Sequence, residues 1–330
     1  MHEPAALPAP LPPSEPDKAA PSSAAPIMAT MNPRTRRQGI RNAFDRAAES
    51  YDEAADIQRE ICARLSAFAL SLHLQPALRT DAPVLDAGCG TGFGFAELDR
   101  LCPGAARIAL DLAPSMLKQA GRRHALARVA TRPAEAPACA RIAHSRDAGK
   151  SSEFLAVCGD LEHLPLANAS LALIWSSLAI QWCDPGRALA ECARVLAPGG
   201  VALVATLGPR TLWELREAFA PIDGARHTID FHPAQDWMRA AQAAALTSLA
   251  HDTVELHACA PDLRGLLQDI KRIGAATVDG GRRRQPLGRA AWARLQASYE
   301  HHRRPDGRLP ATYDVILLAL CKPPQPARSR

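Results

Sequence analysis

The segment VLDAGCGTGFG, residues 84–94, is the feature that most constrains what this chain can fold into. A short apolar run that leads straight into glycines predicts a buried β-strand and a tight turn, where the backbone comes close to a ligand. The dinucleotide fingerprint G-x-G-x-x-G does not fit, because its third glycine would fall on Phe93 or Phe95. A phosphate-binding G-x-x-x-x-G-K-[ST] loop does not fit either, because no lysine lies between Val84 and Lys118.

An acidic residue, Asp86, stands just before the glycines of this loop, Gly88, Gly90 and Gly92. A carboxylate here would repel a pyrophosphate, but it suits a cationic ligand such as the ammonium and sulfonium of S-adenosylmethionine (SAM). The arrangement resembles motif I of class I SAM-dependent methyltransferases. The resemblance implies that SAM lies against these four residues; the alternative is an ordinary glycine-rich turn without a ligand.

Composition limits the domain organisation. The chain has 330 residues, 47% of them hydrophobic, which is enough for one large core or one core with a small appendage. Residues 1–36 are rich in Pro, Ala and Ser without apolar periodicity, so we predict a disordered tail there, and a short flexible tail at 322–330. The sequence therefore predicts one domain over residues 37–321.

Charge and cysteine usage narrow the function classes. The formal net charge of +5 is spread along the chain, which argues against a dedicated nucleic-acid binder. No run of 18 apolar residues exists, so no membrane partner is predicted. The nine cysteines are odd in number and contain no C-x-x-C, which argues against a disulfide framework and a zinc site. These features favour a reducing, cytoplasmic compartment and no bound metal.

Short apolar runs alternate with helical patterns from residue 84 onward, which predicts an α/β fold with a mostly parallel sheet and helices on both faces. Two later runs, TVELHAC and YDVILLALC, are expected to add an antiparallel pair and give seven strands. Helical spacing predicts N-terminal helices over 38–74 and a helical lid over about 211–300, while about 121–152 looks like a surface insertion. The expected strands are 84–87, 107–111, 154–160, 171–177, 199–207, 253–259 and 313–321.

Acids follow the next strands as well. In an open α/β sheet a ligand binds beyond the carboxyl ends of the strands, so each strand end is a candidate contact. Asp111 can accept both ribose hydroxyls of an adenosine, and Asp160 can accept from its adenine amino group. Each acid alone could equally cap a helix, but three at successive strand ends favour a ligand. Leu112, Leu161 and Ser176 complete the predicted cofactor contacts.

The segment WSSLAIQWCD, residues 175–184, follows the fourth predicted strand. Its two tryptophans and its glutamine suit an apolar wall around a reacting methyl group, although ordinary core packing explains them too. Methyl transfer proceeds by in-line displacement, for which an enzyme mainly supplies alignment. The chain shows no Ser-His-Asp or metal-ligand pattern, which is consistent with such a reaction.

Four further motifs are more specific: FDRAAESYDEAADIQRE (44–60), WSSLAIQWC (175–183), DIKRIGA (269–275) and LPATYDV (309–315). Together with the glycine loop they resemble the malonyl-acyl-carrier-protein O-methyltransferases of biotin synthesis, over about residues 38–321 apart from the insertion. The resemblance implies a Rossmann-like class I methyltransferase fold. One position departs from the family pattern, because Ser177 stands where the family often has an asparagine.

The resemblance also implies a reaction, in which SAM methylates the free carboxylate of a malonyl thioester on acyl carrier protein. A carboxylate with a pKa near ~4 is already ionised at neutral pH, so no general base is required. Tyr51, His227, Lys271 and Arg282 match the family pattern and are the candidate substrate contacts. The alternatives are a core tyrosine, a structural histidine and solvated basic residues.

Other functions share the core motifs. The chain could methylate another small acid or a quinone precursor, resemble the methyltransferase-like assembly factors that act on proteins, or bind SAM as a regulator without catalysis. The IKRIGA and LPATY motifs favour the carrier-protein substrate.

Overall fold

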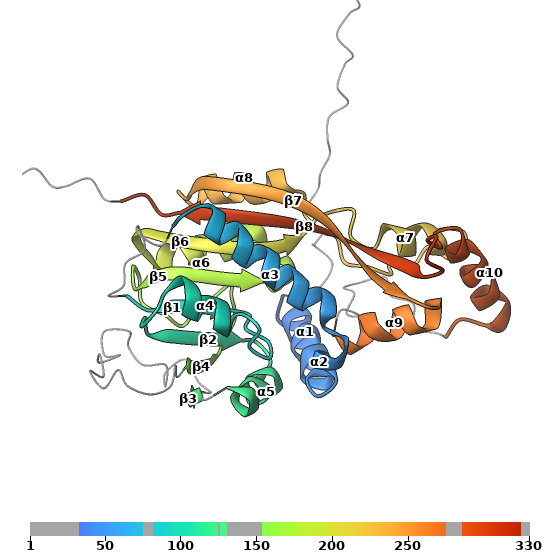
Figure 1. The fold of residues 1–330 in the computed structure, drawn as a ribbon, viewed down its shortest axis with the longest axis horizontal. Helices are drawn as coiled ribbons and strands as arrows, with labels where there is room; N and C mark the ends of the chain where they lie inside the picture. The colour runs from blue at the N-terminus through green and yellow to red at the C-terminus, as the bar shows by residue number, and fades with distance from the viewer. Residues whose placement is uncertain (1–32, 75–81, 125, 131–153, 275–285, 325–330) are drawn as a thin grey trace, which may run out of the picture.

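The computed structural model describes residues 33–74, 82–124, 126–130, 154–274 and 286–324. One sheet runs through the molecule with helices on both faces (Figure 1). In this described part the sheet has eight strands in the order β3-β4-β2-β1-β5-β6-β8-β7. Strands β1 to β6 pair with one another in parallel, whereas β8 is antiparallel to β6 and β7 is antiparallel to β8.

The predicted class I methyltransferase fold is confirmed, including the antiparallel pair at the end of the sheet. The strand that the prediction missed is β3, which lies within the segment interpreted as an insertion. The bounds are β1 Val84–Ala87, β2 Arg107–Asp111, β3 Leu126–Ala130, β4 Phe154–Cys158, β5 Leu171–Ser177, β6 Leu196–Leu207, β7 Thr247–Ala260 and β8 Leu309–Cys321.

Alternation along the strands separates two hydrophobic cores. In β5, Leu173 and Trp175 pack into one core, whereas Ile174 between them packs into the other. Successive side chains of a strand point to opposite faces, so an almost unbroken apolar strand needs helices on both sides. The first core includes α3 (Asp56–Ser71), α4 (Phe95–Leu101) and α5 (Pro114–Arg123); the second includes α6 (Pro185–Val195) and α8 (Ala234–Ala243).

The N-terminal boundary differs from the prediction. Helix α1 spans Pro33–Ala47, so part of the predicted 1–36 tail is helical; residues 1–32 lie outside the described residues. Proline is well tolerated at the start of a helix, because its missing N–H is not needed there. Ion pairs hold this helix in place, because the Arg37 guanidinium pairs with Asp160 and Glu162. The short helix α2 (Tyr51–Ala54) follows, before α3.

The predicted lid is smaller than expected. Helix α8 packs against α6 and ends at Ala243, and β7 begins at Thr247, so this part of the predicted lid packs with the sheet instead. Of the described helices in the range predicted for the lid, α7 (Trp213–Phe219), α9 (Leu263–Arg272) and α10 (Arg289–Glu300) lie at one end of the sheet. Helix α9 lies beside α2 (Figure 1).

Order also extends past the predicted C-terminal boundary, because the Lys322 ammonium donates to the Leu196 carbonyl oxygen at 2.7 Å. Over the described ranges, no helix is both long and apolar enough to cross a membrane.

Candidate functional site

The glycine loop folds back onto β2. The N–H groups of Gly88 and Cys89 both donate to the Leu110 carbonyl oxygen, at 2.7 and 2.9 Å. Gly88 has a φ of +80°, and a Cβ on it would lie 2.1 Å from the Cβ of Ala179, so only glycine fits. Gly92 leaves room for the neighbouring His124 ring, because a Cβ there would lie 2.9 Å from that ring. Gly88 and Gly90 line a cavity beyond the strand ends, and Gly92 does not.

We call this first space the loop cavity; it has a volume of about 90 Å³. Six predicted cofactor contacts line it. Of these, Asp111 ends β2 and accepts hydrogen bonds from the N–H of Gly90 at 2.9 Å and of Ala113 at 2.8 Å. Burial raises the pKa of Asp111 to about 6, and these backbone hydrogen bonds oppose the rise. The lining is Arg37, Ile40, Phe44, Tyr51, Gly88, Gly90, Asp111, Leu112, Met116, Asp160, Leu161, Glu162, Ser177, Leu178, Ala179, Trp182 and Cys183.

Asp160 lies at this cavity with a partner that the sequence did not predict. The Arg37 Nε of α1 is 2.7 Å from the Asp160 Oδ2, while Oδ1 accepts from the N–H of Glu162 at 2.9 Å. At the other end of α1, Asp45 Oδ1 accepts from the N–H of Ser115 at 2.9 Å. Helix α1 is therefore fastened across the loop cavity at both ends.

A smaller space, the side cavity, adjoins the loop cavity next to Asp86. Three buried polar atoms at it have no hydrogen-bond partner: Gln58 Oε1, Asp86 Oδ2 and Trp175 Nε1. Burial, and secondarily the charge of Asp111, raise the pKa of Asp86 to about 8. Buried polar groups without partners are rare, so these three point to a polar ligand group between them.

Ser176, like Gly92, is a predicted cofactor contact that lines neither the loop cavity nor the side cavity. The Ser176 hydroxyl is buried and donates to the Ala87 carbonyl oxygen at 2.9 Å, so its hydrogen bond is made within the sheet and not to a ligand. Its neighbour Ser177 lines both the loop cavity and the side cavity instead. The alternation of strand side chains accounts for the difference, since one residue further along faces the other way.

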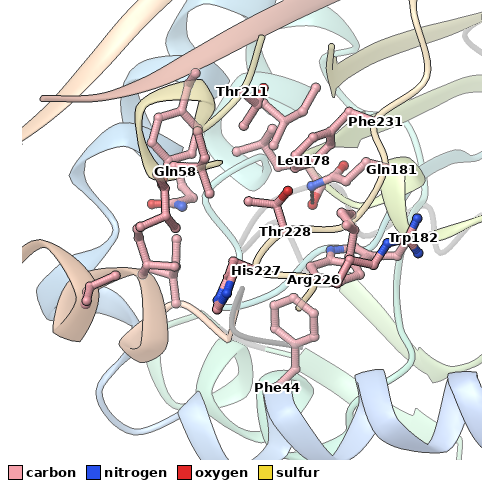
Figure 2. Close-up of a pocket in the computed structure, with 18 of the residues that line it drawn as sticks. Phe44, Gln58, Leu178, Gln181, Trp182, Thr211, Arg226, His227, Thr228 and Phe231 are labelled. Carbon is pink, nitrogen blue, oxygen red and sulfur yellow. Dashed lines mark hydrogen bonds between the residues drawn. The ribbon is translucent and has the colours of Figure 1, made fainter. Parts of the chain in front are cut away.

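A third space, the lid cavity, lies between the sheet end and the lid and has a volume of about 290 Å³ (Figure 2). Its lining is largely apolar. Most of it comes from α7, α9 and the segments 178–182 and 226–231, and α1, α2 and α3 contribute one side chain each. The lining is Phe44, Tyr51, Gln58, Leu178, Gln181, Trp182, Leu207, Thr211, Leu212, Leu215, Phe219, Arg226, His227, Thr228, Ile229, Phe231, Leu267, Ile270, Ile273, Leu287 and Tyr313.

The loop cavity and the lid cavity share a wall. Phe44, Tyr51, Leu178 and Trp182 line both, and the Phe44 and Trp182 rings meet edge to face with centroids 5.7 Å apart. Leu178 has a φ of +56°, a strained conformation for a residue with a branched side chain. Groups bound in the two cavities would therefore contact the same four side chains.

Two of the four predicted substrate contacts line the lid cavity, Tyr51 and His227. Burial raises the pKa of Tyr51, with further contributions from Asp111 and Asp52, so its hydroxyl stays protonated at neutral pH. The His227 ring stacks on Phe219 with centroids 3.4 Å apart, and its Nε2 is 2.8 Å from Asp223 Oδ1.

The other two predicted contacts do not reach this cavity in the described part of the chain. Lys271 is exposed on α9 and does not line the cavity, whereas Leu267 and Ile270 of the same helix and Ile273 just after it do. Arg282 lies outside the described residues.

The sequence interpretation missed Arg226, which supplies a guanidinium to the lid cavity and pairs with Asp230 (Figure 2). Its only signal in the sequence was its position next to His227.

Comparison with known proteins agrees with this geometry. A model described as a methyltransferase domain matches residues 85–204. A malonyl-[acyl-carrier protein] O-methyltransferase from Dechloromonas aromatica (strain RCB) is 43% identical over 287 residues, which cover 86% of this chain and 94% of the relative. The protein of the same name from Laribacter hongkongensis (strain HLHK9) is 42% identical, over 86% of this chain and 88% of the relative.

The chain belongs to the malonyl-[acyl-carrier protein] O-methyltransferase family. The similarity extends to a fused relative: the "Biotin biosynthesis bifunctional protein BioHC" of Cellvibrio japonicus (strain Ueda107) is 35% identical over 87% of this chain and 50% of that protein. Family membership covers the lid as well as the glycine loop, because the matches to the first two relatives extend far beyond residues 85–204.

Proposed function

We propose that this protein transfers the methyl group of SAM to the free carboxylate of a malonyl group on acyl carrier protein, in an early step of biotin synthesis. The observation that carries the proposal is the wall shared by two chemically different cavities. The loop cavity and side cavity offer carboxylates to a cationic nucleoside, whereas the lid cavity offers a guanidinium to an anionic acceptor. The relatives that carry this activity in their names support the same substrates.

SAM would lie across the first two cavities, with a lining residue for each of its polar groups. Its ribose hydroxyls would donate to Asp111, and its adenine would lie near Asp160 and Leu161. Its α-ammonium would donate to Gln58 Oε1 and Asp86 Oδ2, the two acceptors left without partners at the side cavity. Its α-carboxylate would accept from Trp175 Nε1, the third such atom. This placement directs the sulfonium methyl toward the shared wall.

The acceptor would lie in the lid cavity. Arg226 and His227 are the groups there that can bind a carboxylate, and Arg226 is the only Arg or Lys among the described residues of the lining. A malonyl carboxylate is ionised at neutral pH, so catalysis consists of holding its oxygen in line with the methyl–sulfur bond. Tyr51 at the shared wall would donate a hydrogen bond to this carboxylate, because its hydroxyl stays protonated.

Methylation replaces an anionic carboxylate by a neutral ester. The product therefore no longer pairs with Arg226, which favours its release, and its uncharged end resembles an ordinary acyl chain. The displacement as proposed assigns no role to a metal ion.

The carrier protein would approach from the lid. Helix α9 presents Leu267 and Ile270 to the cavity and exposes Lys271 and Arg272 to solvent. Such exposed cations attract an acidic partner over a Debye length of about 8 Å at physiological ionic strength. We place the reaction in the cytoplasm, consistent with the odd number of cysteines.

Turnover of purified protein with SAM and malonyl carrier protein tests the proposal directly, with S-adenosylhomocysteine and the methyl ester measured by mass spectrometry. We expect methylation of malonyl carrier protein, none of acetyl carrier protein, and a rate at limiting acceptor that falls with added salt. Equal activity on small free dicarboxylic acids without salt dependence would favour a small-acid methyltransferase. SAM binding without turnover on any acceptor would indicate a regulator.

A further inference from the structure

Tyr51 occupies a position shared by no other residue in the described chain, because it lines the loop, side and lid cavities together. It begins α2, a helix of four residues with no side-chain cap. A helix this short is not stable by itself, so contacts with the rest of the protein must fix it.

Those contacts converge on the neighbouring residue, Asp52. Its Oδ1 accepts from the Thr91 hydroxyl at 2.6 Å, and its Oδ2 lies 2.8 Å from the Arg123 guanidinium. Its carbonyl oxygen accepts from Arg59 at 2.9 Å. Thr91 belongs to the glycine loop and is only 1% exposed, so its hydroxyl has little access to water.

An aromatic contact supports the same arrangement. The Tyr51 ring stacks on Phe93, which follows the glycine loop, with centroids 6.2 Å apart. Arg59 and Arg123 each place a guanidinium 5.2 Å from the centroid of the Phe93 ring. The two cations that hold Asp52 therefore also hold the ring on which Tyr51 rests.

We propose that Asp52 is a positioning residue that ties α2 to the glycine loop and so keeps Tyr51 at the wall where SAM and the acceptor meet. The connection is short: Gly90 lines the loop cavity, and the adjacent Thr91 donates to Asp52. Occupation of the loop cavity by the cofactor then steadies the segment that carries Tyr51. This inference rests on the proposed function for its kinetic consequence, but its structural part requires only that SAM binds.

The kinetic test is a double-mutant cycle between Asp52→Ala and Tyr51→Ala. A displacement of about 1 Å at a reacting centre costs about a hundredfold in rate, so Asp52→Ala is expected to lower kcat by about that factor while the Kd of SAM changes less than about threefold. If Asp52 acts through Tyr51, Asp52→Ala lowers kcat less than about twofold further in the Tyr51→Ala background. Multiplicative losses, or an unchanged kcat in Asp52→Ala, overturn the inference.

Two further variants separate positioning from loss of structure. Thr91→Val removes the hydroxyl donor at nearly constant volume. Asp52→Asn keeps an acceptor for Thr91 but loses the charge opposite Arg123. The kcat of both variants should lie between those of wild type and Asp52→Ala. The matched control is Asp56→Ala. The Asp56 side chain pairs with the same Arg59 but is 91% exposed, so the kcat of this variant should equal that of wild type. A loss in Asp56→Ala as large as in Asp52→Ala would contradict a specific role for Asp52.

A measurement without any acceptor distinguishes this inference from the proposed function. Hydrogen–deuterium exchange of peptides covering residues 48–56 should slow when S-adenosylhomocysteine binds wild type, and it should slow much less in Asp52→Ala. If this pattern holds while malonyl carrier protein is not methylated, the proposed function fails and the positioning role stands. Equal protection in both proteins overturns the positioning role even if malonyl carrier protein is methylated.

Discussion

Asp86 provides a quantitative test of cofactor binding. Its pKa of about 8, raised mainly by burial, means that about nine-tenths of the molecules carry a protonated Asp86 at pH 7. Ionising the group there costs on the order of 1 kcal/mol, since each pH unit below the pKa adds roughly that amount. Binding of the SAM α-ammonium selects the ionised form. SAM binding at pH 7 should therefore release about 0.9 proton from Asp86, and the affinity should rise about tenfold from pH 6 to pH 7 before it levels off near pH 8.

Calorimetric titration with SAM in two buffers of different ionisation enthalpy measures the released protons directly. Asp86→Asn is the control, because an amide cannot ionise; its proton release should be lower by about 0.9, and the rise in affinity from pH 6 to pH 7 should disappear. Equal proton release by wild type and Asp86→Asn would refute the assignment of the α-ammonium to this carboxylate.

Four further predictions concern the stability of the ligand-free protein and the contacts of the cofactor and the acceptor. Because the folded pKa of Asp86 lies above its ordinary 3.8, its contribution to stability falls as pH rises from about 4 to about 8, so Asp86→Asn should raise the Tm of ligand-free protein more at pH 8 than at pH 5 in scanning fluorimetry. Arg226→Met should lower kcat/KM for malonyl carrier protein about ten- to a hundredfold, through loss of a charged hydrogen bond, and leave the Kd of SAM unchanged in titration. In Gly94→Ala the new Cβ would lie 2.6 Å from Asp86 Oδ2, so calorimetry should show SAM affinity weakened about tenfold or more. Arg37→Met removes a partly exposed ion pair with Asp160, and the same titration should show only about a two- to fivefold loss.

The sequence predicted those parts of the molecule that depend on local pattern. Buried strands are recognisable as short apolar runs, and a residue that directly follows a strand must lie at the ligand edge of a parallel sheet, which is why Asp111 and Asp160 were found. Strand β3 was not found, because Leu126–Ala130 lies in a stretch of Arg, Ala and Pro without a clear apolar run.

Contacts between distant segments could not be predicted in the same way. The pairing of Arg37 with Asp160 depends on where α1 lies over the sheet, and no spacing in the sequence encodes that position. Arg226 lies outside any helix or strand, so no periodicity shows which way it faces. Lys271 lies beside the apolar face of α9, since it is four residues after Leu267 and one after Ile270, both of which line the cavity. Helical spacing alone therefore does not decide whether its side chain reaches the cavity.

The wall formed by Phe44, Tyr51, Leu178 and Trp182 has a consequence for inhibitors. The same four side chains bound the loop cavity and the lid cavity, so a single molecule that spans this wall would contact the residues of both. An adenosine joined at its 5′ position to a short chain ending in a carboxylate would place its nucleoside against Asp111 and its anion near Arg226. Once the nucleoside is bound, the linked carboxylate meets its pocket at a millimolar effective concentration or higher. Such a compound would compete with SAM and with the carrier protein at once, which neither half alone can do.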